Sequence, residues 1–169
     1  MDLIRRLGAA IRRLLFPERS IVVPPPPPFD DKSVYITVAR AREIITNTLG
    51  KKISSNVHIH LADMVYYCPS VEYVNYLLSQ DDTDRMKYTK EVFDCDDYSW
   101  LLKGRFCLDA YKDGKRRASH AAGIVWGMLP LPHAMFWVIT DDLELRLIEP
   151  QTDAWKEWGD SFKIWLMAA

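Results

Sequence analysis

Three side chains in this 169-residue chain have the types and order that nucleophilic chemistry needs: Cys95, His133 and Glu149. A thiol becomes a strong nucleophile when it ionises, and the free N–H groups at the start of a helix stabilise the thiolate. The stretch VFDCDDYSWLLKGRFCLDAY, residues 92–111, has helical periodicity and places Cys95 in its first turn. An imidazole could take the thiol proton, and a carboxylate behind it could orient the ring. These residues are therefore predicted to be catalytic.

The position of His133 depends on a hairpin register. His133 opens the strand candidate HAMFWVIT, and the next strand candidate, LELRLIE, leads into Glu149, Pro150 and Gln151. A strict two-residue turn would place His133 opposite Pro150, whereas one additional loop residue would place it opposite Glu149 or Gln151. Either shifted register puts a polar partner on the face of the sheet that the ring occupies, whereas the strict turn does not. Gln151 is the additional candidate beside Glu149.

The surrounding pattern predicts an α+β fold, in which a central helix packs on an antiparallel sheet. The predicted helices are 37–50, 69–82 and 95–111, and the predicted strands are 56–67, 119–127, 133–140 and 143–149. Thr37 and Ser70 have the side chains of helix N-caps, and Gly50 is a helix stop. The helix at 95–111 carries two apolar stripes and is expected to be buried on most sides. His120 is expected at the surface.

The N-terminal part differs in composition from the rest. Residues 2–16 alternate apolar residues and four arginines at helical spacing, and five consecutive prolines follow at 24–28. We therefore expect a basic amphipathic helix and a polyproline linker over 1–28, and one folded domain over 29–169. Residues 1–20 could contact a membrane surface, a virion, another copy of the chain or their own domain.

The bulk composition excludes some classes of protein. The net charge is -1, so that nothing in the overall charge favours a nucleic-acid partner. Three cysteines form neither an even disulfide set nor a paired zinc motif, which favours a reducing compartment. No apolar run is long enough for a membrane span, and no signal peptide is apparent. A cytoplasmic location, in a bacterial host cell or for a phage-encoded protein, is expected.

Four segments, FDCDDYSWLLKGRF, GIVWG, PHAMFWV and LIEPQTD, resemble one branch of the papain-like superfamily. That branch is the C-terminal cysteine protease domain of the fairy-ring mushroom agglutinin, with its bacterial and phage relatives. The resemblance implies a papain-like fold, a triad of Cys95, His133 and Glu149, and cleavage of peptide or isopeptide bonds. It also implies calcium dependence, with Asp96 and Asp97 as metal ligands.

The two aspartates have a second interpretation that requires no metal. Carboxylates in the first turn of a helix interact favourably with its dipole, by up to about 1 kcal/mol each. They also raise the pKa of a neighbouring thiol, and a bound cation would cancel that effect. The sequence leaves both interpretations open. It likewise leaves open two alternatives to the hydrolase: an inactive papain-like interaction module, and acyl transfer of the transglutaminase or amidase type.

Overall fold

The computed structural model describes residues 33–169 except 51–52, 114–115, 130 and 160–161. The described strands are β1 (Val34–Thr37), β2 (Ile53–His60), β3 (Val65–Cys68), β4 (Ser119–His120), β5 (Ala122–Leu129), β6 (Leu131–Ile139), β7 (Leu145–Glu149), β8 (Ala154–Lys156) and β9 (Lys163–Ala168). The described helices are α2 (Val38–Leu49), α3 (Val71–Gln80), the short 3-10 helix η2 (Thr83–Arg85) and α4 (Cys95–Asp113).

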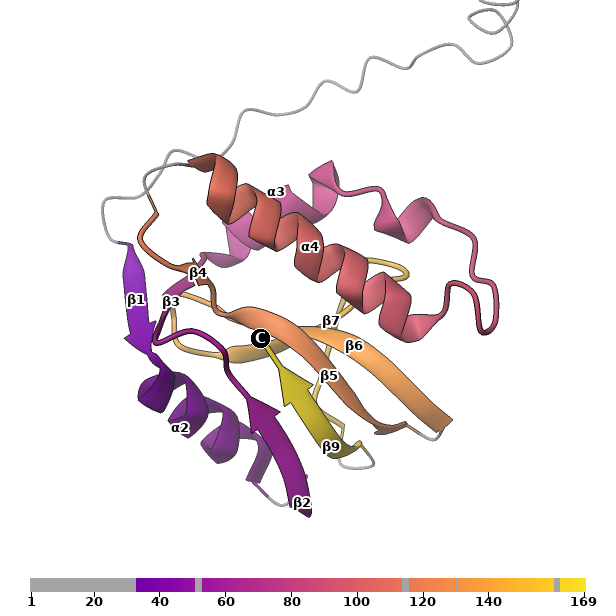
Figure 1. Cartoon of the computed structure of the whole chain (residues 1–169), viewed down its shortest axis with the longest axis horizontal. Helices are drawn as coiled ribbons and strands as arrows, with labels where there is room; N and C mark the ends of the chain where they lie inside the picture. The colour runs from indigo at the N-terminus through magenta and orange to yellow at the C-terminus, as the bar shows by residue number, and fades with distance from the viewer. Residues whose placement is uncertain (1–32, 51–52, 114–115, 130, 160–161) are drawn as a thin grey trace, which may run out of the picture.

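The described strands form two mixed sheets. The larger sheet has six strands in the order β2-β9-β5-β6-β7-β8, and its β2–β9 pair is parallel while the other pairs are antiparallel. The smaller sheet has the order β1-β3-β4, with β1 antiparallel and β4 parallel to β3. The parallel pairs join segments that are far apart in the sequence. For example, β9, near the C-terminal end of the described residues, pairs with β2 (Figure 1).

Helices cover both faces of the six-stranded sheet. On one face, α3 and α4 lie over β5, β6 and β7, where Leu102 and Phe106 pack against Phe136. On the other face, α2 packs its buried side chains against Met135, Trp137 and their neighbours. Since β6 alternates between the two apolar cores, its residues from 134 to 139 are fully buried. This rigid strand carries His133 at its start.

The helix boundaries follow local chemistry that the sequence shows. The Thr37 side chain accepts a hydrogen bond from the Arg40 N–H at 3.3 Å, and the Ser70 side chain accepts one from the Tyr73 N–H at 3.1 Å. Gly50, which ends α2, has a φ of 47°, where a side chain would be strained. The predicted caps and the predicted stop are therefore confirmed.

The predicted fold class needs correction. The sheet is not purely antiparallel, because β2 and β9 run parallel, and a second mixed sheet is present. The helix α4 is not a central helix buried on most sides: Trp100, Leu108 and Tyr111 on its outer face are exposed. The structure therefore has two mixed sheets with helices packed outside the larger one, in place of the predicted papain-like helix on one antiparallel sheet.

Three further predictions concern the strand at 56–67, the N-terminal segment and a membrane span. The segment predicted as a single strand, 56–67, contributes to β2 of one sheet and β3 of the other. The predicted N-terminal helix and proline linker lie outside the described residues. Among the helices that the structure describes, none has both the length and the apolar character of a membrane span.

Candidate functional site

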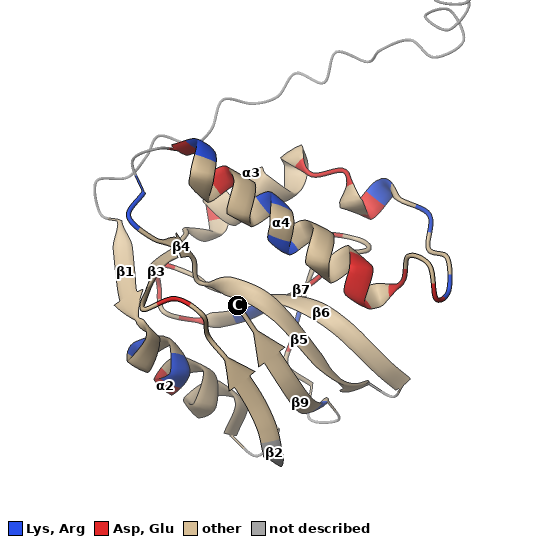
Figure 2. Ribbon diagram, in the orientation of Figure 1, with Lys and Arg blue, Asp and Glu red and all other residues tan. Residues whose placement is uncertain are grey.

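Cys95 is the first residue of α4, as the sequence predicts. The Asp94 carbonyl accepts the Tyr98 N–H at 3.1 Å, and the Asp97 carboxylate accepts the Asp94 N–H at 3.1 Å. The bond from the Asp94 N–H to the Asp97 side chain is one half of a capping box, and the bond from the Tyr98 N–H to the Asp94 carbonyl is the first backbone bond of the helix. Figure 2 shows the acidic residues concentrated at this end of α4. The thiol is half-buried and belongs to no disulfide.

The β6–β7 hairpin brings His133 to Glu149. Ile139 pairs with Leu145, so the connecting loop is longer than two residues, and the register continued down the hairpin places His133 opposite Gln151. Glu149 then lies diagonally beside the ring on the same face. The His133 Nε2 lies 2.7 Å from the Glu149 Oε2, and the Gln151 N–H donates to the Glu149 Oε1 at 3.3 Å. Of the registers that the sequence leaves open, the hairpin has the shifted one that the predicted pairing of His133 with Glu149 requires.

All four predicted side chains line one cavity of about 480 Å³ at the amino end of α4. Its full lining is Tyr88, Cys95, Leu131, Pro132, His133, Met135, Leu147, Glu149, Gln151, Lys156 and Glu157. Sequence reasoning missed Tyr88, Lys156 and Glu157. Lys156 belongs to the three-residue strand β8, which is too short to leave an alternation signal, and Tyr88 lies in a connection without periodicity.

The surroundings of the Cys95 thiol have opposing effects on its charge. Burial raises the pKa of Cys95, and Asp94 and Asp96 raise it further. Hydrogen bonds to the sulfur from the backbone N–H groups of Ala134 and Asp96 act in the other direction. Because Ala134 follows His133 in β6, the sulfur lies at the beginning of the strand that carries the imidazole. The thiol therefore rests protonated in the cavity that it shares with His133.

The predicted metal ligands have different roles in the structure. Ligand atoms of Asp94, Cys95 and Asp96 lie within 4.8 Å of one another. A hydrogen bond between Asp94 and Asp96 lowers the pKa of Asp94 and is the largest cause of the raised pKa of Asp96. The carboxylates of this pair lie close together, and their oxygen donors fit calcium. Asp97 instead caps the helix.

His120, Cys68 and Cys107 do not line this cavity. His120 was expected at the surface, but it is buried, and its Nε2 lies 2.8 Å from the Asp109 Oδ2. Burial is the largest cause of its low pKa, which is about 4. Cys68 is buried with a pKa raised to about 12, chiefly by that burial, whereas Cys107 is exposed.

Comparison of the sequence with models of protein families identifies the family of this chain. The model of the Agglutinin C-terminal family matches residues 66–155, which include Cys95, His133 and Glu149. The chain belongs to the Agglutinin C-terminal family. This confirms the agglutinin part of the predicted resemblance. No curated protein matches the chain.

Two solved structures share the fold. The "PSL1a-E64 complex" aligns with a TM-score of 0.69 at 17% identity over 80% of this chain and 51% of that chain. Polyporus squamosus lectin, bound to the human-type influenza-binding epitope Neu5Aca2-6Galb1-4GlcNAc, aligns with a TM-score of 0.65 at 16% identity over 80% and 49%. The agglutinin-family chain thus spans about half the length of these chains.

These comparisons correct the predicted function. They identify an agglutinin family and the fold of a fungal lectin, and none of them names a hydrolase. The predicted cysteine protease and the associated peptide substrate are therefore not retained. The same holds for the two alternatives, the inactive papain-like module and the acyl-transfer enzyme. The positions of the side chains around the cavity do not depend on that assignment.

Proposed function

We propose that this agglutinin-family domain binds a ligand in the cavity at the amino end of α4, and that Cys95 forms a covalent bond with an electrophilic group of that ligand. The observation that carries the proposal is the convergence of Cys95, His133, Glu149 and Gln151 on one cavity, with His133 held 2.7 Å from Glu149. A lone cysteine at a helix start would not suffice, because a buried thiol usually acts as a small apolar residue.

Each polar group has a distinct part in the proposal. The Nε2–H of His133 donates to Glu149, which leaves Nδ1 as the nitrogen that accepts the thiol proton. Glu149 orients the ring and stabilises its cationic form. The Gln151 N–H holds the second oxygen of Glu149, so that the carboxylate is fixed at both ends. The sulfur can then attack as the thiolate, although burial raises its resting pKa.

Calcium is proposed as a modulator of this thiol. A cation on Asp94 and Asp96 would neutralise the two charges that raise the pKa of Cys95. When bound, it would supply positive charge beside the sulfur and no other chemistry. Asp97 is left out of this group because its carboxylate accepts a backbone hydrogen bond from Asp94.

Alkylation by iodoacetamide tests the proposed nucleophile. In that reaction the sulfur–carbon bond forms, the carbon–iodine bond breaks, iodide leaves and His133 receives the thiol proton. The exposed Cys107 in the same chain serves as the internal reference. We expect His133→Gln to slow alkylation of Cys95 at least about 100-fold and to leave the rate at Cys107 unchanged. Peptide mapping by mass spectrometry measures both rates.

E64, the compound complexed with PSL1a, is the second probe. We expect one E64 bound per wild-type chain and none bound to Cys95→Ala, measured by intact mass after dilution. Cys107→Ala is the matched control and should bind E64 as the wild type does. Equal alkylation of Cys95 in wild type and His133→Gln, or E64 bound by Cys95→Ala, would contradict the proposal.

A second candidate ligand is the glycan bound to the Polyporus squamosus lectin, which ends in Neu5Ac. A carboxylate of such a sugar could pair with Lys156, which lines the same cavity. Titration calorimetry with this trisaccharide tests it. Loss of trisaccharide binding in Lys156→Ala would support the glycan as a ligand of this cavity. Unchanged binding in Lys156→Ala would show that the sugar does not bind through Lys156.

A further inference from the structure

The connection from η2 to α4 contains an exposed loop beside the Cys95 cavity. Every residue of the 86–92 loop, MKYTKEV, is exposed. They include three large apolar or aromatic side chains, Met86, Tyr88 and Val92, which are 46%, 49% and 74% exposed. A folded domain buries most side chains of this kind or scatters them singly, and a group of them marks an interaction surface. The 86–92 loop is therefore a candidate for contact with a partner.

Backbone contacts hold the 86–92 loop in a defined turn. The Phe93 N–H donates to the Thr89 carbonyl at 2.8 Å, and the Thr89 N–H donates to the Phe93 carbonyl at 2.9 Å. Glu91 has a φ of 60°, which residues other than glycine seldom adopt, and its N–H donates to the Asp94 Oδ2 at 3.3 Å. The Phe93 ring lies 4.5 Å from the Tyr98 ring of α4. The loop is thus anchored to α4 while its own side chains stay exposed.

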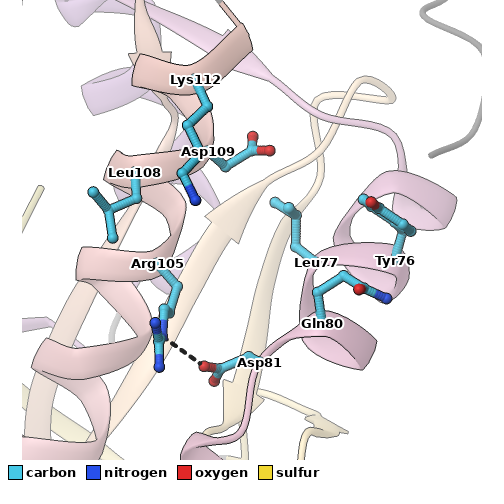
Figure 3. Close-up of a pocket in the computed structure, with 8 residues that line it drawn as sticks. All are labelled: Tyr76, Leu77, Gln80, Asp81, Arg105, Leu108, Asp109 and Lys112. Carbon is cyan, nitrogen blue, oxygen red and sulfur yellow. Dashed lines mark hydrogen bonds and ion pairs between the residues drawn. The ribbon is translucent and has the colours of Figure 1, made fainter. Parts of the chain in front are cut away.

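The beginning of the connection is fixed as well. Arg105 of α4 reaches across to the end of α3, where its Nε lies 3.2 Å from the Asp81 Oδ1 (Figure 3). The Arg105 Nη2 lies 2.7 Å from the Asp82 Oδ1, and the Tyr98 hydroxyl donates to the Met86 carbonyl. Because both ends of the 86–92 loop are tied to α4, the loop requires little ordering when it meets a partner, and the entropic cost of that contact is small.

The start of β6 forms another side of the same cavity. Leu131 and Pro132 line the cavity together with Tyr88 of the loop, and Leu131 is 72% exposed. Two segments that are about forty residues apart in the sequence therefore place exposed apolar side chains around one opening. We call the 86–92 loop together with Leu131 and Pro132 the mouth surface.

The mouth surface is basic as well as apolar. Lys87 and Lys90 are exposed and form no ion pair with any residue that the structure describes, whereas Glu91 is the single carboxylate of the loop (Figure 2). The aspartates at 94–97 are half-buried at the start of α4. The outermost charges of the loop are thus mainly positive, which favours a partner with negative charge. The exposed apolar side chains require that this partner also accept apolar groups.

We propose that the mouth surface docks on a lipid bilayer that contains anionic headgroups. Apolar side chains such as Val92 and Leu131 would enter the boundary between headgroups and acyl chains, and Lys87 and Lys90 would contact the headgroups. Tyr88 suits the same depth, because its ring is apolar and its hydroxyl is polar. A nucleic acid or another soluble polyanion would match the lysines and leave the apolar side chains in water.

This docking would turn the opening of the Cys95 cavity toward the lipid, because Tyr88 and Leu131 belong to both the mouth surface and the cavity lining. A ligand carried by the membrane could then enter the cavity from the lipid surface. The docking requires no reaction at Cys95. It therefore does not rest on the proposed covalent chemistry, and either proposal can fail without the other.

Co-sedimentation of the full chain with lipid vesicles tests the docking. We expect the chain to bind mixed phosphatidylcholine–phosphatidylserine vesicles more tightly than pure phosphatidylcholine vesicles. The double variant Lys87→Gln/Lys90→Gln should bind the mixed vesicles about tenfold more weakly or less. The matched control is Lys112→Gln/Arg117→Gln, which removes the same charge from exposed positions near the other end of α4 and should bind as the wild type does. Equal binding of Lys87→Gln/Lys90→Gln and wild type would overturn the proposal.

The arginines of residues 1–20 could also contact the vesicles, so the comparison is repeated without them. In the background Arg5→Gln/Arg6→Gln/Arg12→Gln/Arg13→Gln, binding to the mixed vesicles should persist and should still depend on the two loop lysines. Loss of all vesicle binding in this background would assign the membrane contact to the N-terminal segment and would contradict the proposal.

An apolar variant separates a bilayer from a soluble polyanion. Val92→Ser/Leu131→Ser should weaken binding to the mixed vesicles about tenfold and leave binding to heparin as in the wild type. Both positions are exposed, so that this variant is expected to fold. Met64→Ser, which changes a side chain that is 77% exposed next to the small sheet, is the control and should change neither. Unchanged vesicle binding in Val92→Ser/Leu131→Ser would show that the surface recognises negative charge alone, and the bilayer would be excluded as its specific partner.

Discussion

Two imidazole–carboxylate pairs in the described part of the chain are alike in geometry and different in surroundings. His133 lies 2.7 Å from Glu149 with 22% and 14% of the side chains exposed, whereas His120 lies 2.8 Å from Asp109 with 1% and 20% exposed. The first pair opens into a cavity shared with a thiol, and the second is enclosed by aromatic rings and a guanidinium. A short imidazole–carboxylate contact therefore does not by itself mark a reactive site. The exposure of the pair to a cavity and the side chains that surround it decide its role.

The enclosed pair is part of a buried network that joins α4 to the small sheet. Arg116 lies between the rings of Tyr67 and Tyr73, with its guanidinium 4.6 and 4.7 Å from the ring centroids. It also forms ion pairs with Asp109 and Asp113, each at 2.7 Å. Only 1% of the Arg116 side chain is exposed. A buried charge that is paired with two carboxylates and stacked on two rings stabilises the fold when every partner is present.

Removing that guanidinium should produce the largest change in stability. Arg116→Met keeps much of the apolar volume but leaves Asp109 and Asp113 without their cation, and we expect a loss of about 3–5 kcal/mol. Urea unfolding at pH 7 measures it. Arg117→Met is the adjacent control and should change stability by less than about 0.5 kcal/mol. A loss below about 1 kcal/mol for Arg116→Met would show that the network is not structural.

Acid should weaken the same network through His120. The folded pKa of His120 is about 4, below its ordinary value of 6.5, because the ring is buried. Between these two values the unfolded chain binds more protons than the folded chain, so that stability falls as the pH falls through this window. The loss should approach about 3 kcal/mol by pH 4. The carboxyl of Asp109 titrates below this window, because its pKa is lowered by His120 and Arg116.

Unfolding in urea from pH 7 to pH 4 measures the loss, and His120→Gln is the control. The variant has a lower stability at pH 7 but should lack most of the decline between pH 6.5 and pH 4. An equally steep decline in His120→Gln would assign the acid sensitivity to other groups and would remove the contrast between the two pairs.

The sequence predicts what is local and misses what requires distant contacts. Thr37 and Ser70 act as caps because their hydroxyls bond within one turn, and the position of Cys95 at the start of α4 follows from the same local rules. The pairing of β6 with β7 as a hairpin follows from their short connection, although the sequence leaves its register open. In contrast, the parallel β2–β9 pair joins distant segments, and the burial of His120 depends on α3, β3 and α4 together. Neither leaves a periodic signal.

In the open pair, Glu149→Gln should change reactivity more than stability. The neutral amide keeps a contact to His133 but cannot stabilise the imidazolium, and we expect Cys95 alkylation to slow about tenfold or more. Stability should change by less than about 1 kcal/mol, since the pair is partly solvated. Alkylation kinetics and urea unfolding on the same preparation measure both. A large stability loss without a rate change would make this pair structural, like the other.

The smallest effect should come from Gln151, even though its side chain lines the cavity. Its contact with Glu149 is made by the backbone N–H, at 3.3 Å, and that donor survives in Gln151→Ala. We therefore expect the rate of Cys95 alkylation to fall by less than about threefold, within the effect of one hydrogen bond of about 1 kcal/mol. Parallel alkylation of Gln151→Ala and Glu149→Gln measures the difference. If Gln151→Ala slows the reaction as much as Glu149→Gln does, the side-chain amide of Gln151 itself contacts the thiol or the reagent. That contact would be additional to the backbone hydrogen bond to Glu149.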